Sequence, residues 1–274
     1  MSAKHRCNRN GSEKRPHPLN PLTPAGVGLS RPALLASASL IALAALDLPG
    51  AARAACVPTP QIISGPFAGP VVSNGGAITV TGSGKISGGP DGVDALACAI
   101  TTLTNQSGGT ILGAAGGTGL SGGVGVSNAN TITALANSGK ILGGAGGKGS
   151  TLGGSGGARV SNAKGATIGS LSNATGATIV GGNGNSGIAL FGGAGGDGLS
   201  NAGTITTLSN SGAISGGNGG SGSYIRAGGA GVSNARTITT LSSSAKIIGG
   251  NGGSDGKTGG AGGAGVSNFG NLVF

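Results

Sequence analysis

Residues 126–141 read VSNANTITALANSGKI, and the same pattern returns along the rest of the chain. It begins again at Val160, Leu199, Val232 and Val266, at spacings of 34, 39, 33 and 34 residues. A period of this size is typical of stacked arrays, in which each repeat buries the apolar face of its neighbour. The pattern therefore predicts a solenoid rather than a globular core.

Each repeat alternates turn residues with strand residues. The copy that starts at Leu199 contains Asn-x-Gly-x-Ile twice, at residues 201–205 and 210–214. Asn and Gly favour turns, whereas Thr and Ile favour strands. We predict an all-β fold: a right-handed parallel β-helix or solenoid, built from Gly/Asn/Thr/Ile repeats of about 33–39 residues with Gly-rich loops between them. The right hand follows the preference of parallel crossover connections.

The apolar positions of the repeats align as four ladders that should point inward. The first is Val126, Val160, Leu199, Val232 and Val266; the second Ile132, Ile168, Ile205 and Ile238; the third Leu135, Leu171, Leu208 and Leu241; the fourth Ile141, Ile179, Ile214 and Ile247. The Asn of Val/Leu-Ser-Asn also recurs, as Asn128, Asn162, Asn201, Asn234 and Asn268. We expect these amides to hydrogen-bond along the stack at the turns.

Some copies depart from the regular repeat. The second is longer, with insertions in the turns at residues 163–166 and 174–177. Two shorter copies come earlier, with aliphatic positions Ile100, Leu103 and Ile111 in one and Val72, Ile78 and Ile86 in the other. Terminal copies that cap an array are expected to be atypical. For the Gly-rich stretches such as 216–229, two interpretations stay open: excursions without structure, or extra strands of the coil.

The amino-acid composition argues against a compact globular core and is compatible with such an array. The chain has 65 Gly, no Trp and only 8% charged residues. A disordered Gly-rich polymer is the alternative, but the periodic aliphatic residues favour the solenoid. Of the net charge of +10, half belongs to residues 1–54, and the later basic residues are scattered. Nucleic-acid binding needs clustered charge, so we expect no nucleic-acid partner.

Residues 1–54 have the three parts of a secretory signal peptide, with a long n-region. Residues 1–31 are polar and basic, 33–46 are apolar, and Ala52-Arg53-Ala54 supplies small residues for cleavage after Ala54 or Ala55. A 14-residue apolar stretch is short for a membrane span. A lipoprotein signal ending at Cys56 is the alternative, but Arg53 stands where such signals carry a Leu-like residue.

Cleavage would leave two cysteines, Cys56 and Cys98. An even pair in an exported chain predicts a disulfide, with two free thiols as the alternative. We expect residues 55–98 to form an N-terminal capping segment closed by this disulfide. Residues 99–274 then form the solenoid repeats.

The long n-region, the early cysteine pair and the tandem Gly-Val-Ser-Asn-Ala-x-Thr-Ile-Thr-x-Leu-x-Asn-Ser-Gly-x-Ile units resemble bacterial autotransporter passenger segments. The resemblance covers most of the chain from about residue 55. It implies a right-handed β-helix displayed on the outer surface as an adhesin or biofilm factor. It also implies a C-terminal translocator barrel; no series of alternating strands precedes Phe274, so we expect a truncated passenger.

Reactive residues are few after the leader. His5, His17 and Glu13 all lie within residues 1–54, so general acid–base catalysis lacks its usual groups and we expect no enzyme, no catalytic residues and no cofactor. Gly192–Leu199 matches one turn of a calcium-binding nonapeptide through Asp197, but Ala264 replaces the acid in the equivalent stretch. Asp91 and Asp94 favour a solvated turn over an acid pair. No metal site is expected.

The sequence therefore predicts a non-enzymatic exported repeat protein for cell-surface structure or adhesion. Its partner would be a host cell, a neighbouring cell or a glycan, with membrane contact only through a translocator barrel. The chain would reach the cell surface, outer membrane or extracellular space in a full-length form, and the periplasm if it is complete. The alternatives are an ice- or glycan-binding solenoid and a disordered Gly-rich fragment. The binding face would be the outward Thr pairs 131/133, 204/206 and 237/239, a ladder interrupted at Gly169.

Overall fold

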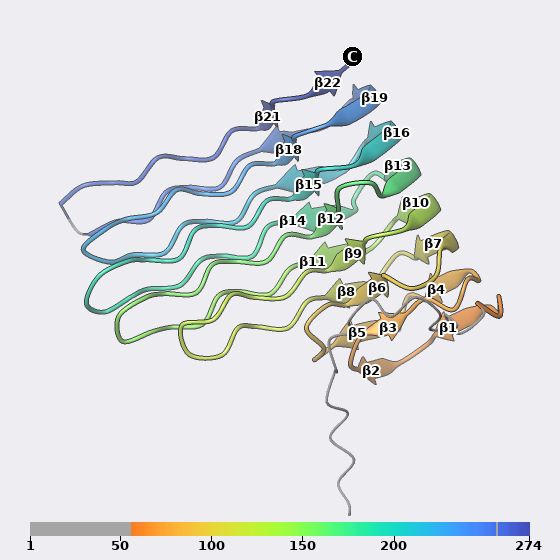
Figure 1. The fold of residues 1–274 in the computed structure, drawn as a ribbon, viewed down its shortest axis with the longest axis horizontal. Helices are drawn as coiled ribbons and strands as arrows, with labels where there is room; N and C mark the ends of the chain where they lie inside the picture. Colours follow the sequence, from red (N-terminus) through yellow and green to blue (C-terminus); the bar gives the residue numbers. More distant parts are fainter. Residues whose placement is uncertain (1–55, 256) are drawn as a thin grey trace, which may run out of the picture. The chain divides into compact units, whose positions relative to one another are not determined.

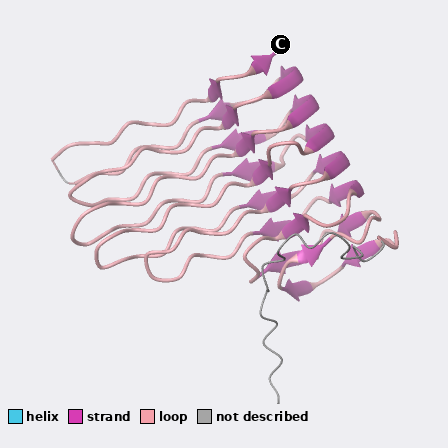
Figure 2. Ribbon diagram, in the orientation of Figure 1, coloured by secondary structure: helices cyan, strands magenta, loops and turns pink. Residues whose placement is uncertain are grey.

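The computed structural model describes residues 56–255 and 257–274. The predicted signal peptide, residues 1–54, lies outside the described residues. Across the described part every regular element is a β-strand, and no helix is present (Figure 2). The prediction of an all-β parallel solenoid is confirmed: three parallel sheets run along the stack, and each turn contributes one strand to each sheet (Figure 1).

The first sheet, sheet A, has eight strands. In stacking order they are β1 (Gln61–Ile63), β4 (Ile78–Val80), β7 (Ile100–Asn105), β10 (Thr131–Asn137), β13 (Thr167–Asn173), β16 (Thr204–Asn210), β19 (Thr237–Ser243) and β22 (Asn271–Leu272).

Sheets B and C have seven strands each. Sheet B contains β2 (Pro66–Ala68), β5 (Lys85–Ser87), β8 (Thr110–Leu112), β11 (Lys140–Leu142), β14 (Thr178–Val180), β17 (Ala213–Ser215) and β20 (Ile247–Ile248). Sheet C contains β3 (Val71–Val72), β6 (Val93–Ala95), β9 (Val126–Asn128), β12 (Val160–Asn162), β15 (Leu199–Asn201), β18 (Val232–Asn234) and β21 (Val266–Asn268).

Successive turns stack in register. In sheet A, Ile132 pairs with Ile168, Ile168 with Ile205, and Ile205 with Ile238. Strands of two to seven residues are too short to fold alone, so each depends on backbone hydrogen bonds to the turns on either side. Identical aliphatic side chains then lie one above the other and fill the narrow interior of the coil.

Two ladders of buried asparagine hold the corners between the sheets. The Val/Leu-Ser-Asn residues form the predicted one, with Nδ2 of Asn128 donating to Oδ1 of Asn162 at 2.8 Å and the same bond repeated at later turns. A second ladder, which the sequence analysis missed, runs at the end of the long sheet A strands. It joins Asn105, Asn137, Asn173, Asn210 and Ser243.

The irregular copies fit the stack with one correction. The inserted residues of the second copy form turns in which Gly165 and Gly176 have positive φ and open space around them. In the first copy, Ile78 and Ile86 are buried as expected, but Val72 is 49% exposed and its neighbour Val71 is the core residue. Strand β3 is two residues long, so hydrophobicity alone did not indicate which valine faces inward.

The Gly-rich stretches between sheets B and C are ordered chains rather than excursions without structure. Each of segments 113–125, 143–159, 181–198 and 216–231 leaves the coil, turns at a tip and returns; residues 249–255 and 257–265 follow the same course next in the stack (Figure 1). Every third amide bonds to the next turn: Gly113 to Leu142 O, Gly116 to Ala145 O and Gly119 to Lys148 O. Three residues per turn is the period of a polyproline II helix, so these segments are extended chains but not strands.

A second set of hydrogen bonds joins the outgoing and returning chains. Gly157 N donates to Gly144 O at 2.9 Å, and Gly182 N of the next turn donates to Gly157 O at 2.9 Å. The result is a two-layered array of polyglycine-like chains, which we call the glycine lattice. In its inner turns, the Gly-Gly-X triplets place both glycines in the hydrogen-bonded interior and the X side chain outside.

The glycines of the lattice are required for space rather than for backbone conformation. Among the described glycines of these segments, only Gly119 has a positive φ. A Cβ added at Gly217 would overlap the carbonyl oxygen of Gly182, and one added at Gly157 would overlap that of Gly123. Hydrogen-bonded chains can approach this closely only without side chains.

We expect Gly217→Ala to lower the free energy of unfolding by about 1–3 kcal/mol, because its methyl group has no room in the lattice. Gly262→Ala is the matched control, since its Cβ would lie 3.5 Å from the nearest atom, Gly250 O. That variant should be neutral or slightly stabilising. Urea midpoints compare the two, and equal midpoints would contradict a close-packed lattice.

Candidate functional site

The structure places the predicted ladder residues inside the coil. All of them are buried apart from Ile247 and Val266, which are partly buried near the C-terminal end of the stack. Ile100, Leu103 and Ile111 continue the ladders toward the N-terminus. These side chains hold the fold together and are aliphatic, so binding chemistry has to come from the outward faces and from the tips.

Cys56 and Cys98 are joined by a disulfide, with their Cα atoms 5.9 Å apart. Cys98 is buried in the turn between β6 and β7, whereas Cys56 precedes β1. The bond therefore fastens the segment ahead of the first strand to the turn that leads into β7. This position, at the start of the stack, indicates a structural role for the disulfide.

Outward hydroxyl groups line sheet A in rows. Thr131, Thr167, Thr204 and Thr237 follow one another in register, and Thr207 pairs with Thr240. Neighbouring strands lie about 4.8 Å apart, so each row repeats its hydroxyl at that interval. Gly169 interrupts the surface on β13, as the sequence indicated.

Sheet C carries a simpler outward row. Ser127, Ser161, Ser200, Ser233 and Ser267 pair in sequence along the stack and are partly buried. Asp94 pairs with Ser127 at the N-terminal end of this row. Burial, followed by the charge of Asp91, raises the pKa of the Asp94 carboxyl. Asp91 Oδ1 accepts a hydrogen bond from Val124 N.

Asp197, the carboxylate of the nonapeptide-like stretch, makes the same kind of hydrogen bond at the aligned position three turns further along the stack. Its Oδ1 accepts a 2.8 Å hydrogen bond from Ala230 N in the next turn, just as Asp91 does from Val124 N. Burial raises the pKa of the Asp197 carboxyl, and the hydrogen bonds from Ala230 and Ser233 oppose that rise. Within residues 56–255 and 257–274, no three His, Cys, Asp or Glu side chains gather as metal ligands.

Arg159 is the one arginine that the described structure buries. It occupies a position held by Gly125, Gly198 and Gly231 in neighbouring repeats, directly before the sheet C strand. Its side chain is 4% exposed, and within the described residues its Nε and Nη1 have no hydrogen-bond partner. Burial lowers the pKa of the guanidinium to about 9. Such a group destabilises the folded state.

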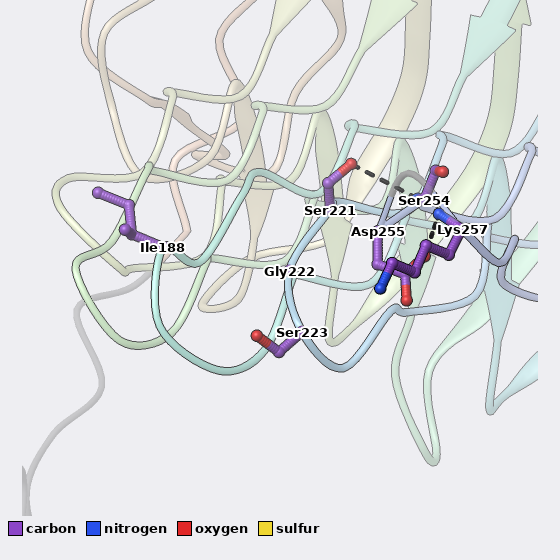
Figure 3. Close-up of a pocket in the computed structure, with 7 residues that line it drawn as sticks. All are labelled: Ile188, Ser221, Gly222, Ser223, Ser254, Asp255 and Lys257. Atoms are coloured by element: carbon purple, nitrogen blue, oxygen red, sulfur yellow. Dashed lines mark hydrogen bonds between the residues drawn. The ribbon is translucent and has the colours of Figure 1, made fainter.

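The tips of the glycine lattice form a distinct surface. An open hollow of about 460 Å³ lies there, lined by Ile188, Ser221, Gly222, Ser223, Ser254, Asp255 and Lys257 (Figure 3). Ser254 N donates to Ser221 Oγ across the gap between two turns. Three of the seven lining residues are serines, and the two charged ones are Asp255 and Lys257.

An aromatic pair lies on the returning chains near the same tips. Leu152, Phe191 and Tyr224 follow one another through parallel bridges in successive turns. The rings of Phe191 and Tyr224 stack with centroids 4.7 Å apart and planes inclined by 26°. The guanidinium of Arg226 lies 4.8 Å from the centre of the Phe191 ring, within the range of a cation–π interaction.

This surface was not predicted from the sequence. The signal was present in the Gly-Gly-X period, which fixes the X side chains outside, and in the aromatic residues at aligned X positions. It was not predicted because the sequence left open whether the Gly-rich stretches are excursions without structure or extra strands of the coil. Residues that lie 33 or more positions apart in the sequence come into contact only when the turns stack.

Among residues 56–255 and 257–274, no helix is long and apolar enough to cross a membrane. The chain matches no protein-family model, and neither a curated protein nor a solved structure shows significant similarity to it. The sheet topology and the hydrogen bonds define its architecture: three parallel sheets stacked as a β-solenoid, with an attached glycine lattice.

We expect Arg159→Gly to raise the free energy of unfolding at pH 7 by about 1–3 kcal/mol, because it removes an unpartnered buried cation. The gain should be smaller at pH 10. Above pH about 9 the buried guanidinium loses its proton in the folded protein, while the unfolded chain still holds it, so the stability of the wild-type protein rises.

Urea unfolding at both pH values measures this effect. Arg236→Ala, which removes an exposed arginine, serves as the control and should change little. An Arg159→Gly variant less stable than the wild type at pH 7 would show that the side chain contributes packing that outweighs its charge.

Proposed function

We propose that this protein is a non-catalytic, exported surface protein for cell-surface structure or adhesion, of the autotransporter-passenger type. One observation carries the proposal: each turn presents the same outward side chains in register, as in the Ser127-to-Ser267 row of sheet C. A surface that repeats every turn supports many weak, simultaneous contacts, which together give strong attachment.

The destination of the chain rests on its leader and on the likeness of its repeats to passengers. The signal-peptide pattern of residues 1–54 supports export. The disulfide at Cys56 and Cys98 supports an oxidising compartment. We propose that the chain works outside the cytoplasm, and at the cell surface where a translocator barrel carries it there.

Surface display in a non-adherent bacterium, through a fused translocator, tests adhesion. We expect displaying cells to be retained on glass or on a cultured-cell monolayer, and Ile214→Asp to abolish retention. A carboxylate at this fully buried position should destabilise the solenoid by about 3 kcal/mol or more. Ala213→Asp, on the exposed neighbour, is the matched control and should keep retention.

Equal retention of displaying and empty cells would contradict an adhesive role. Retention of the Ile214→Asp cells at the wild-type level would show that adhesion does not need the folded solenoid.

The Thr rows of sheet A support a second candidate, an ice- or glycan-binding face. Hydroxyl groups in register at about 4.8 Å spacing form a regular array that a crystalline surface could match. Gly169 and the alanines of β10, Ala134 and Ala136, break the array, so adhesion is the stronger proposal.

Thermal hysteresis of the purified protein tests the ice-binding candidate. If the Thr face binds ice, Thr206→Lys should abolish the hysteresis, because a long charged side chain rises above the hydroxyl plane. Ala213→Lys, on sheet B, should leave it intact. Equal freezing and melting points for the wild-type protein would eliminate the ice-binding candidate.

A further inference from the structure

The aromatic pair at the tips is not required by the fold. Leu152 occupies the position aligned with Phe191 in the preceding turn, and the lattice stacks there without an aromatic ring. Tyr224 is 57% exposed, so its ring remains largely in solvent. Tyrosine combines an apolar ring with a polar hydroxyl group, and exposed tyrosines are typical of binding surfaces.

Arg226 departs from the lattice pattern at the same point. Its counterpart in the preceding turn is Gly193, where an added Cβ would overlap Gly154 O. Arg226 is exposed, and its guanidinium lies beside the Phe191 ring instead of entering the interior. No described carboxylate forms an ion pair with it. The substitution of a lattice glycine thus places a cation next to an exposed aromatic stack.

The hollow extends this surface across neighbouring turns. Ser221 and Ser223 come from the tip that leads into Tyr224, and Lys257 from the next tip (Figure 3). The Asp255 carboxylate accepts hydrogen bonds from Lys257 N, Thr258 N and Thr258 Oγ1, which hold it within its own loop and lower its pKa. The lone acid of the hollow is therefore engaged in the loop that contains it.

We propose that these tips bind an acidic polysaccharide. The tip surface comprises Phe191, Tyr224, Arg226, the hollow of Figure 3 and Lys148 on an earlier tip. Ring faces pack against the C–H face of a sugar, serine hydroxyls bond its hydroxyls, and Arg226 bonds its carboxylate or sulfate groups. This inference rests on the proposed adhesive function and names its ligand class and site.

The charge of the tips and the shape of the hollow favour an acidic polysaccharide as the ligand. The tips carry Lys148, Arg226 and Lys257 against Asp255, so the surface is positively charged. The hollow is open and spans several turns rather than enclosing one small molecule. A linear polymer with an anionic group on each sugar can lie across successive tips and contact several of them at once.

Affinity electrophoresis of the purified protein tests the proposal, with polygalacturonate as the acidic probe and dextran as the neutral one. We expect polygalacturonate alone to retard the wild-type protein. Tyr224→Ala and Arg226→Ala should each weaken binding about 5- to 10-fold, in keeping with the loss of an aromatic contact or a charge-assisted contact. Unchanged thermal melts would show that these variants remain folded.

Matched controls separate a built site from diffuse attraction. Arg236→Ala removes the same charge away from the tips, and Phe269→Ala removes an aromatic ring that is 85% exposed elsewhere; both should bind within about twofold of the wild type. Equal losses for Arg226→Ala and Arg236→Ala would overturn the proposal, as would equal retardation by dextran. Absence of polygalacturonate binding in a protein that still retains displaying cells would overturn this site and leave the adhesive function standing.

Discussion

The close approach of backbone to backbone is the constraint on which the structure depends. In the glycine lattice, amides such as Gly157 N and Gly182 N reach carbonyl oxygens of neighbouring chains at 2.9 Å, with no space for a Cβ between them. The same requirement acts in the coil, where strands as short as two residues hold only through bonds to the adjoining turns. Backbone pairing thus provides the order that large apolar side chains provide in a globular core.

This construction separates structural positions from surface positions. Aliphatic ladders and asparagine amides face inward, as at Ile205 and Asn173, and in the inner turns of the lattice neighbouring chains enclose the triplet glycines. The outward strand positions, the turns and the third residue of each triplet meet solvent. Their repetition from turn to turn gives each face one chemical character: hydroxyl on sheets A and C, and mixed aromatic and cationic at the tips.

The aliphatic ladders and one asparagine ladder could be predicted because equivalent residues recur at a fixed period. When the repeats stack, residues one period apart lie in contact. The ladder through Asn137 was missed, since Asn-Ser-Gly alone indicates only a turn, and Val72 was chosen over Val71 because a two-residue strand has no alternation to read. The amino-acid composition gave no indication of the tip surface. The spacing did, since Phe191 and Tyr224 lie 33 residues apart, close to one repeat period.

The sequence by itself determined the β-solenoid, its register and its buried ladders, because each follows from periodicity and from the strand and turn preferences of Ile, Thr, Asn and Gly. The tertiary structure decided the path of the Gly-rich segments and what their tips present. Glycine has no side chain to show an inward or outward preference, so only the packed lattice fixes its orientation. The stacking of Tyr224 on Phe191 and the position of Arg226 follow from that packing.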